Sequence, residues 1–139
     1  GEDRLKIEDM VNAMGLQESV IFHGSVSNVI NRIAKSKMLV LSSDYEGIPN
    51  VILEAFTAGT PVVSTDCSPG GARVLINDGE NGYLVPIRNP ILLAKQMETV
   101  VDNEELANRF IVKSKKLLTN FEPGRIYHEW DQFLKKIVL

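Results

Sequence analysis

The sequence predicts an α/β fold in which helices flank a mostly parallel sheet. Up to position 85, short apolar runs alternate with segments whose apolar residues repeat at helical spacing. Strands that alternate with helices pair in parallel and are joined by right-handed crossovers. After position 86 the apolar spacing is purely helical, which predicts a helical C-terminal tail. The 139 residues, 44% of them hydrophobic, suit one globular domain, and no boundary is evident inside the chain.

The first predicted element is a helix over 4–14, whose apolar residues recur every three or four positions. Gly15 follows it and can supply the left-handed residue that ends a helix. The next apolar run, Val20-Ile21-Phe22, predicts a short strand that is buried on both faces. The chain therefore begins with a helix followed by a strand.

A second helix and strand follow in the same order. Apolar residues over 29–34 lie on one side of a predicted helix, which Ser27 or Asn28 could cap through its side chain. The run 38–41 predicts another strand that is buried on both faces. The alternation then continues with a helix near 51–58, a strand at 61–65, a short helix near 72–76 and a strand at 83–85.

The last predicted helix carries an apolar stripe that includes Trp130, Phe133 and Leu134. Such a stripe could form a partner surface or line a cofactor site. Stripes at helical spacing more commonly pack into a protein core. We therefore expect these side chains to be buried.

Ligands of an open parallel sheet bind outside the carboxyl ends of its strands. Three loops follow predicted strands, at 23–26, 42–50 and 65–72. The second of these loops leads directly into a helix. The loops at 42–50 and 65–72 follow consecutive strands, and we take the former as the centre of the candidate site.

The loop at 42–50 has the residue types of an anion site. Gly47 permits close approach of a ligand to the backbone, Pro49 fixes the start of the next helix, and Asn50 is a good cap. Free amides and the helix dipole favour a phosphate there. The carboxylates of Glu46 and Glu54 can accept hydrogen bonds from sugar or ribose hydroxyls. Acidic residues near a helix start also stabilise its dipole, so a purely structural role stays open.

Three blocks of the sequence together resemble the C-terminal domain of glycosyltransferase family 4, also called group 1. The blocks are 43–55, 59–65 and 78–86, and the first contains two glutamates with seven residues between them. The resemblance implies the Rossmann-like C-terminal half of a GT-B-type enzyme. It also implies a retaining transferase that takes a nucleotide-sugar donor and requires no metal or other cofactor, in polysaccharide or glycolipid biosynthesis.

The resemblance assigns roles within the donor site. Glu46 would be catalytic and contact the donor sugar, Glu54 would hold the ribose hydroxyls, and amides around Asn50 and Val51 would hold the pyrophosphate. The loop at 24–26 would line the base. The implied donor-binding residues are Glu46, Gly47, Ile48, Pro49, Asn50, Val51, Glu54, Gly24, Ser25 and Val26.

Other residues are weaker candidates. His23 ends a predicted strand beside the proposed base site, and Gly70 and Gly71 are the paired glycines of the third loop. Family members often carry a glutamate shortly after these paired glycines, where this chain has Val74. Arg73 is a further candidate for a phosphate or hydroxyl contact.

The resemblance also implies that the single donor-binding domain, 1–139, is incomplete at its N-terminus. The family's domain opens with a strand and loop whose arginine and lysine clamp the pyrophosphate, and then a second strand. Those two strands would lie between 20–22 and 38–41, so we expect exposed sheet edges or a different pairing. The acceptor-binding domain is missing too, and we expect this part alone to be inactive.

Composition and motifs bound the alternatives. The net charge of −3, with dispersed Lys and Arg, disfavours nucleic acid, and no apolar run approaches the roughly 20 residues of a membrane span. We expect a cytoplasmic protein, with peripheral attachment of the full-length protein to the inner membrane face left open.

Asp44 with Glu46 resembles a metal-binding acidic pair, although the helix that follows disfavours this. A nucleotide-binding regulatory module and a nucleotide-sugar epimerase remain alternatives.

Overall fold

The centre of the molecule is a parallel sheet of three strands. The computed structural model of the chain describes residues 3–137. Its strands are β1 (Leu39–Leu41), β2 (Val62–Thr65) and β3 (Tyr83–Val85), in the order β1-β2-β3. Leu39 pairs with Val62, and Val63 pairs with Tyr83, so all three strands run in the same direction. The predicted α/β class is confirmed.

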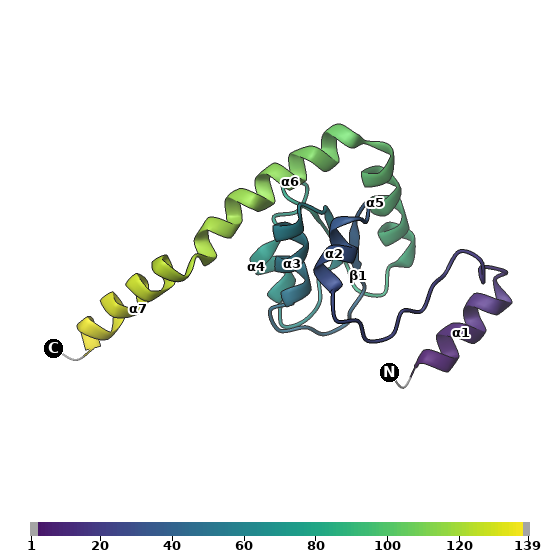
Figure 1. Ribbon diagram of the computed structural model, residues 1–139, viewed down its shortest axis with the longest axis horizontal. Helices are drawn as coiled ribbons and strands as arrows, with labels where there is room; N and C mark the ends of the chain where they lie inside the picture. Colours follow the sequence, from purple (N-terminus) through teal and green to yellow (C-terminus); the bar gives the residue numbers. More distant parts are fainter. Residues whose placement is uncertain (1–2, 138–139) are drawn as a thin grey trace.

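Helices surround this sheet and extend beyond it (Figure 1). The helix before β1 is α2 (Val29–Ala34), and the crossovers between strands contain α3 (Asn50–Ala58) and α4 (Gly71–Leu75). Four further helical segments complete the order: α1 (Arg4–Ala13), α5 (Pro90–Asp102), α6 (Glu104–Leu118) and α7 (Pro123–Ile137), with the 3-10 turn Thr119–Phe121 before α7. Among residues 3–137, no helix has the length and apolar character of a membrane span.

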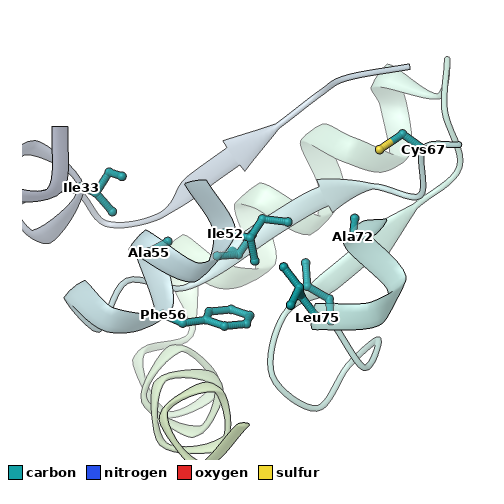
Figure 2. Packing of buried hydrophobic residues seen from close by; sticks show 9 residues of the cluster. Ile33, Ile52, Ala55, Phe56, Cys67, Ala72 and Leu75 are labelled. Carbon is teal, nitrogen blue, oxygen red and sulfur yellow. The ribbon is translucent and has the colours of Figure 1, made fainter. Parts of the chain in front are cut away.

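The core has two parts because successive side chains of a strand point to opposite faces. Val62 packs with Ile52 and Phe56 of α3 on one face, in the cluster that Figure 2 shows. Val63 packs on the other face, in a cluster with Val100 of α5 and Phe110 of α6. Every residue of β2 is buried. The central strand therefore has the two-faced burial that its continuous apolar run predicts.

Helix α6 lies at the amino-terminal edge of the sheet. Phe110 makes an edge-to-face contact with Tyr83, the first residue of β3, with 5.1 Å between the ring centroids. Met38, which immediately precedes β1, packs against the same cluster. The loops that follow the strands consequently lie at the opposite, carboxyl-terminal edge, where the candidate site is expected.

The strand predicted at 20–22 is not formed. This segment belongs to the connection between α1 and α2, and the side chain of Ile21 is 74% exposed. No strand in the described part of the chain lies beside it to accept its backbone hydrogen bonds. Strand β1 is also less buried than expected, because it lies at the edge of the sheet and its three residues are only partly covered. An apolar run identifies a strand only if a neighbouring strand is present.

The expected burial of the last helix is also wrong. Helix α7 projects away from the body of the molecule (Figure 1) and contains no buried residue. Trp130 is 58% exposed, and its ring contacts Phe133 of the same helix rather than the core. The sequence period shows that one face of the helix is apolar, but it does not show that any element covers that face.

Candidate functional site

The candidate site is built on two loops at the carboxyl-terminal edge of the sheet. We call 42–49, which follows β1, the first loop, and 66–70, which follows β2, the second loop. The Thr65 hydroxyl donates to the Ser43 carbonyl at 2.5 Å, and the Glu46 amide donates to the Ser68 carbonyl at 2.9 Å. Tyr45 and Ser68 form an isolated parallel bridge. The backbone around Glu46 is therefore fixed against the second loop.

The side chain of Glu46 is held within the first loop. The Ser43 hydroxyl donates a 2.9 Å hydrogen bond to Oε1 of Glu46. Glu46 is half-buried. A carboxylate that is held by one oxygen is oriented before a ligand arrives, which reduces the entropy lost on binding.

The second loop also contacts the first loop through glycines. Gly71, the first residue of α4, is buried against the backbone of Gly47. Gly70 precedes it with a φ of 106°, in the left-handed region that favours glycine. The paired glycines therefore shape the loop that carries Glu46, a role that sequence reasoning did not assign to them.

Helix α3 begins directly after the first loop. Pro49 occupies its N-cap position, and Asn50 is its first residue without a side-chain capping bond, so the predicted cap at Asn50 is wrong. Pro49 has the extended backbone of an N-cap residue, with a φ of −75° and a ψ of 105°, and Asn50 already lies inside the helix. The first amides of an α-helix have no partner within the helix, and those of Asn50 and Val51 can donate to an anion.

Glu54 lies one turn inside α3. It is half-buried, and it shares a helix face with Asn50, because residues four apart are neighbours on a helix surface. Ile52, Ala55 and Phe56 form the buried face of the same helix. The structure thus places Glu46, the α3 N-terminus and Glu54 along one path from the first loop into the helix.

Two arginine–aspartate pairs border these loops. Arg73 of α4 makes two hydrogen bonds to Asp66, and the Nε to Oδ1 distance is 3.0 Å. The hydrogen bond and the charge of Asp66 raise the pKa of the Arg73 guanidinium above its ordinary value. Arg88, which follows β3, donates to Oδ2 of Asp44 at 3.2 Å. Arg73 therefore binds an aspartate in this structure, and its predicted contact with a phosphate or hydroxyl stays a prediction.

The loop at 24–26 lies in a different environment. An Arg32 guanidinium nitrogen lies 3.1 Å from Nδ1 of His23, and the Arg4 guanidinium approaches Gly24. His23 and Gly24 line a cavity of about 440 Å³ that also includes Ile7 of α1. His23 thus contacts α2 and Gly24 lies beside α1, and the predicted role of 24–26 toward the base stays a prediction.

Sequence reasoning missed Arg88 and gave Asp44 only a metal-binding alternative. In the structure Asp44 pairs with Arg88, and Glu46 accepts from Ser43. Within residues 3–137 no three His, Cys, Asp or Glu side chains are grouped as metal ligands. The position of Arg88, three residues after the end of a predicted strand, is the sequence signal that could have marked it.

Comparison with known proteins places the chain among glycosyl transferases. The family model described as "Glycosyl transferases group 1" matches residues 1–117. The chain is 29% identical over 134 residues to an uncharacterized glycosyltransferase of Haemophilus influenzae, covering 96% of the chain and 38% of that protein. It is 31% identical over 137 residues to a PP-undecaprenol alpha-1,4-N-acetyl-D-galactosaminyltransferase of Campylobacter jejuni, covering 99% of the chain and 37% of that protein. The chain thus spans less than half the length of these relatives.

Solved structures share the fold. A point mutant of S. aureus TarM in complex with Fondaparinux, alpha-GlcNAc-glycerol and UDP is 27% identical to the chain, with a TM-score of 0.84 over 94% of the chain and 26% of TarM. Anabaena HepE in complex with UDP is 23% identical, with a TM-score of 0.88 over 97% of the chain and 37% of HepE. The fold is therefore that of GT-B glycosyltransferases, with a Rossmann-like parallel sheet.

Proposed function

Because the chain belongs to the group 1 family of glycosyl transferases, we propose that it is the donor-binding part of a retaining glycosyltransferase. The donor would be a nucleotide sugar. The observation that carries the proposal is the placement of Glu46 and Glu54 on either side of the α3 N-terminus, at the carboxyl-terminal edge of the sheet. A helix start provides amides for the pyrophosphate, and two carboxylates provide acceptors for hydroxyls.

Each group has a distinct part in this proposal. The amides of Asn50 and Val51 bind the pyrophosphate, and Glu54 accepts hydrogen bonds from the ribose hydroxyls. Glu46 accepts from a hydroxyl of the transferred sugar, with its carboxylate oriented by Ser43. Gly47 and Ile48 line the approach to the pyrophosphate, since both are exposed at the end of the first loop. Gly24, Ser25 and Val26 line the base, and no metal takes part.

The choice of nucleotide is supported by a relative. TarM, at 27% identity, is similar to this chain and was crystallised with UDP. We therefore take UDP as the probe for the site. A nucleoside diphosphate contains the pyrophosphate and the ribose, so its binding depends on α3 and Glu54 but not on the contact between Glu46 and the sugar.

For the whole protein we propose a role in polysaccharide or glycolipid biosynthesis in the cytoplasm. The name of the Campylobacter relative includes a PP-undecaprenol acceptor, and the similar Erwinia amylovora protein AmsD is named for amylovoran biosynthesis. Lipid-linked acceptors would bring the whole enzyme to the inner membrane face. An N-terminal domain would bind the acceptor, and the present chain alone would be inactive.

The test is calorimetric titration of UDP into the chain and its Glu54→Ala variant, with and without magnesium. We expect binding without magnesium, and affinity that falls about tenfold or more in the variant, since hydrogen bonds to charged groups are strong. Glu98→Ala, at an exposed site on α5, is the matched control and should bind as the unaltered chain does. Equal affinity in all three proteins would contradict the assignment of the ribose to Glu54.

Product analysis separates the enzymatic alternative. A nucleotide-sugar epimerase would convert the donor without an acceptor, whereas a transferase would release the nucleoside diphosphate in an acceptor-dependent step. The measurement requires the full-length protein. A regulatory module would bind the nucleotide and do neither.

A further inference from the structure

Arg88 has an unusual backbone conformation. It lies between β3 and α5, and its φ is 58°, in the left-handed region. Of the residues between 3 and 137, Arg88 alone has a positive φ without being glycine. A side chain is disfavoured in this conformation, and glycine or asparagine is the common choice. Residues held in such conformations cluster at functional sites, so the side chain of Arg88 is the feature to explain.

The Arg88 side chain reaches the loop that carries Glu46. Its Nε donates to Oδ2 of Asp44 at 3.2 Å, across 44 positions of sequence. Asp44 lies two residues before Glu46 in the first loop. The two side chains are 80% and 55% exposed, so the pair lies on the surface, where it constrains a loop rather than the core.

The other contacts of the first loop come from the second loop. The Glu46 amide binds the Ser68 carbonyl, and the Ser43 carbonyl accepts from Thr65. The second loop is in turn joined to the end of β3, where the Asp66 amide donates to the Val85 carbonyl at 2.7 Å. Arg88 adds a direct connection from the turn after β3 to the exposed part of the first loop.

We propose that Arg88 is a positioning residue for the donor site, which acts by holding Asp44 and thereby the first loop in the conformation that presents Glu46. This inference rests on the function proposed above. Arg73 does not take this part, because its guanidinium binds Asp66, seven residues earlier, and within residues 3–137 no hydrogen bond joins it to the first loop. The pair with Asp44 is the contact that the Arg88 guanidinium makes from this left-handed turn.

Hydrogen–deuterium exchange of the first loop, measured without ligand, tests the positioning role. In Arg88→Gly the turn is preserved, because glycine adopts a positive φ without strain, and the side chain is lost together with its guanidinium. We expect the amides of 44–48 to exchange about two- to fivefold faster, the range expected for loss of an exposed ion pair. Asp44→Asn should have the same effect, and the double variant should exchange no faster than either single variant.

Two further variants serve as controls. Arg88→Lys keeps the charge and should return exchange toward that of the unaltered chain. Arg109→Gln removes an exposed arginine from α6, at the opposite edge of the sheet, and should change nothing. Unchanged exchange in Arg88→Gly, or additive effects in the double variant, would overturn the inference.

Calorimetric titration of UDP-glucose into the same variants connects the loop to the donor. The affinity of Arg88→Gly and of Asp44→Asn should fall by a factor similar to the change in exchange, while that of Arg109→Gln is unchanged. If the unaltered chain bound neither UDP nor UDP-glucose, the donor site itself would be refuted, together with the role of Arg88 in it. If all variants bound UDP-glucose equally and exchanged equally, the inference about Arg88 alone would fail.

Discussion

Gly71 faces the backbone of Gly47 so closely that a β-carbon at position 71 would lie 1.3 Å from the Gly47 carbonyl oxygen and 2.3 Å from its carbonyl carbon. These distances are far inside van der Waals contact. The atoms opposing Gly71 belong to the main chain, so no side-chain rotation can make room. The start of α4 and the first loop therefore fit together only with glycine at position 71.

Substitution of Gly71 by alanine should displace the first loop. We expect the free energy of unfolding to fall by about 3 kcal/mol or more, at the upper end of the range for overpacking. Binding of UDP should be lost as well, because Gly47 lies between Glu46 and the start of α3. Denaturant unfolding and calorimetry measure the two effects.

Gly124→Ala is the control for this substitution. A β-carbon at position 124 would meet no atom within 4 Å, and alanine favours a helix more than glycine does. Its stability should be unchanged or slightly higher. A Gly71→Ala protein as stable as Gly124→Ala, with UDP binding intact, would contradict the close packing of the two loops.

The two glutamates should separate in their response to ligands. Glu46→Gln should leave the affinity for UDP nearly unchanged but lower the affinity for UDP-glucose, because Glu46 contacts the sugar in the proposed site. Glu54→Gln should lower the affinity for both ligands by about tenfold or more, because the charged hydrogen bonds to the ribose are lost. Calorimetry with the two ligands measures the difference. A Glu46→Gln variant that lost UDP affinity as strongly as Glu54→Gln would contradict the division of roles.

How far the sequence predicts the fold depends on whether the partners of an element are present in the chain. The run at 61–65 becomes the buried central strand β2 and 51–58 becomes α3, because the strands that pair with β2 and the helices that pack on both elements are present. The run at 20–22 has equal apolar character but no adjacent strand within residues 3–137. The spacing of apolar residues shows which side of one segment is apolar, whereas burial also requires a second element that packs on that side.

The candidate site is predictable in part for the same reason. Glu46 and the start of α3 follow a strand, and this is enough to place them at the carboxyl-terminal edge. The contact of Gly71 with Gly47 and the pair of Arg88 with Asp44 each join segments more than 20 residues apart. A single sequence contains no signal for such pairs. They follow from the order of the strands, which brings separate loops together.

A buried amide stabilises the turn before β3. Asn81 is 3% exposed, its Nδ2 donates to the Leu75 carbonyl at 3.0 Å, and its Oδ1 accepts from the Asn77 amide at 2.7 Å. Asn81→Ala leaves both backbone groups without this partner. We expect a loss of about 1–3 kcal/mol in the free energy of unfolding, measured by urea denaturation. Asn108→Ala, at an exposed position of α6, should change stability by less than about 0.5 kcal/mol. Equal losses in the two variants would show that the Asn81 bonds do not stabilise the turn.

The exposure of α7 predicts how the single tryptophan responds to solvent. Trp130 is the only tryptophan of the chain, so tryptophan fluorescence, excited at a wavelength that tyrosine does not absorb, reports on α7 alone. Its emission should be close to that of tryptophan in water and should be quenched readily by iodide, because the side chain is 58% exposed. Phe133→Ala should alter the free energy of unfolding by less than about 0.5 kcal/mol. Phe56→Ala, on the buried face of α3, is the contrasting variant and should lower the free energy of unfolding by about 3–5 kcal/mol.

Tryptophan emission that is protected from iodide only at high protein concentration would show that a second copy covers the apolar face. Protected emission at every concentration, with a large loss in Phe133→Ala, would show that α7 folds back onto the body of the chain and would contradict its projecting position.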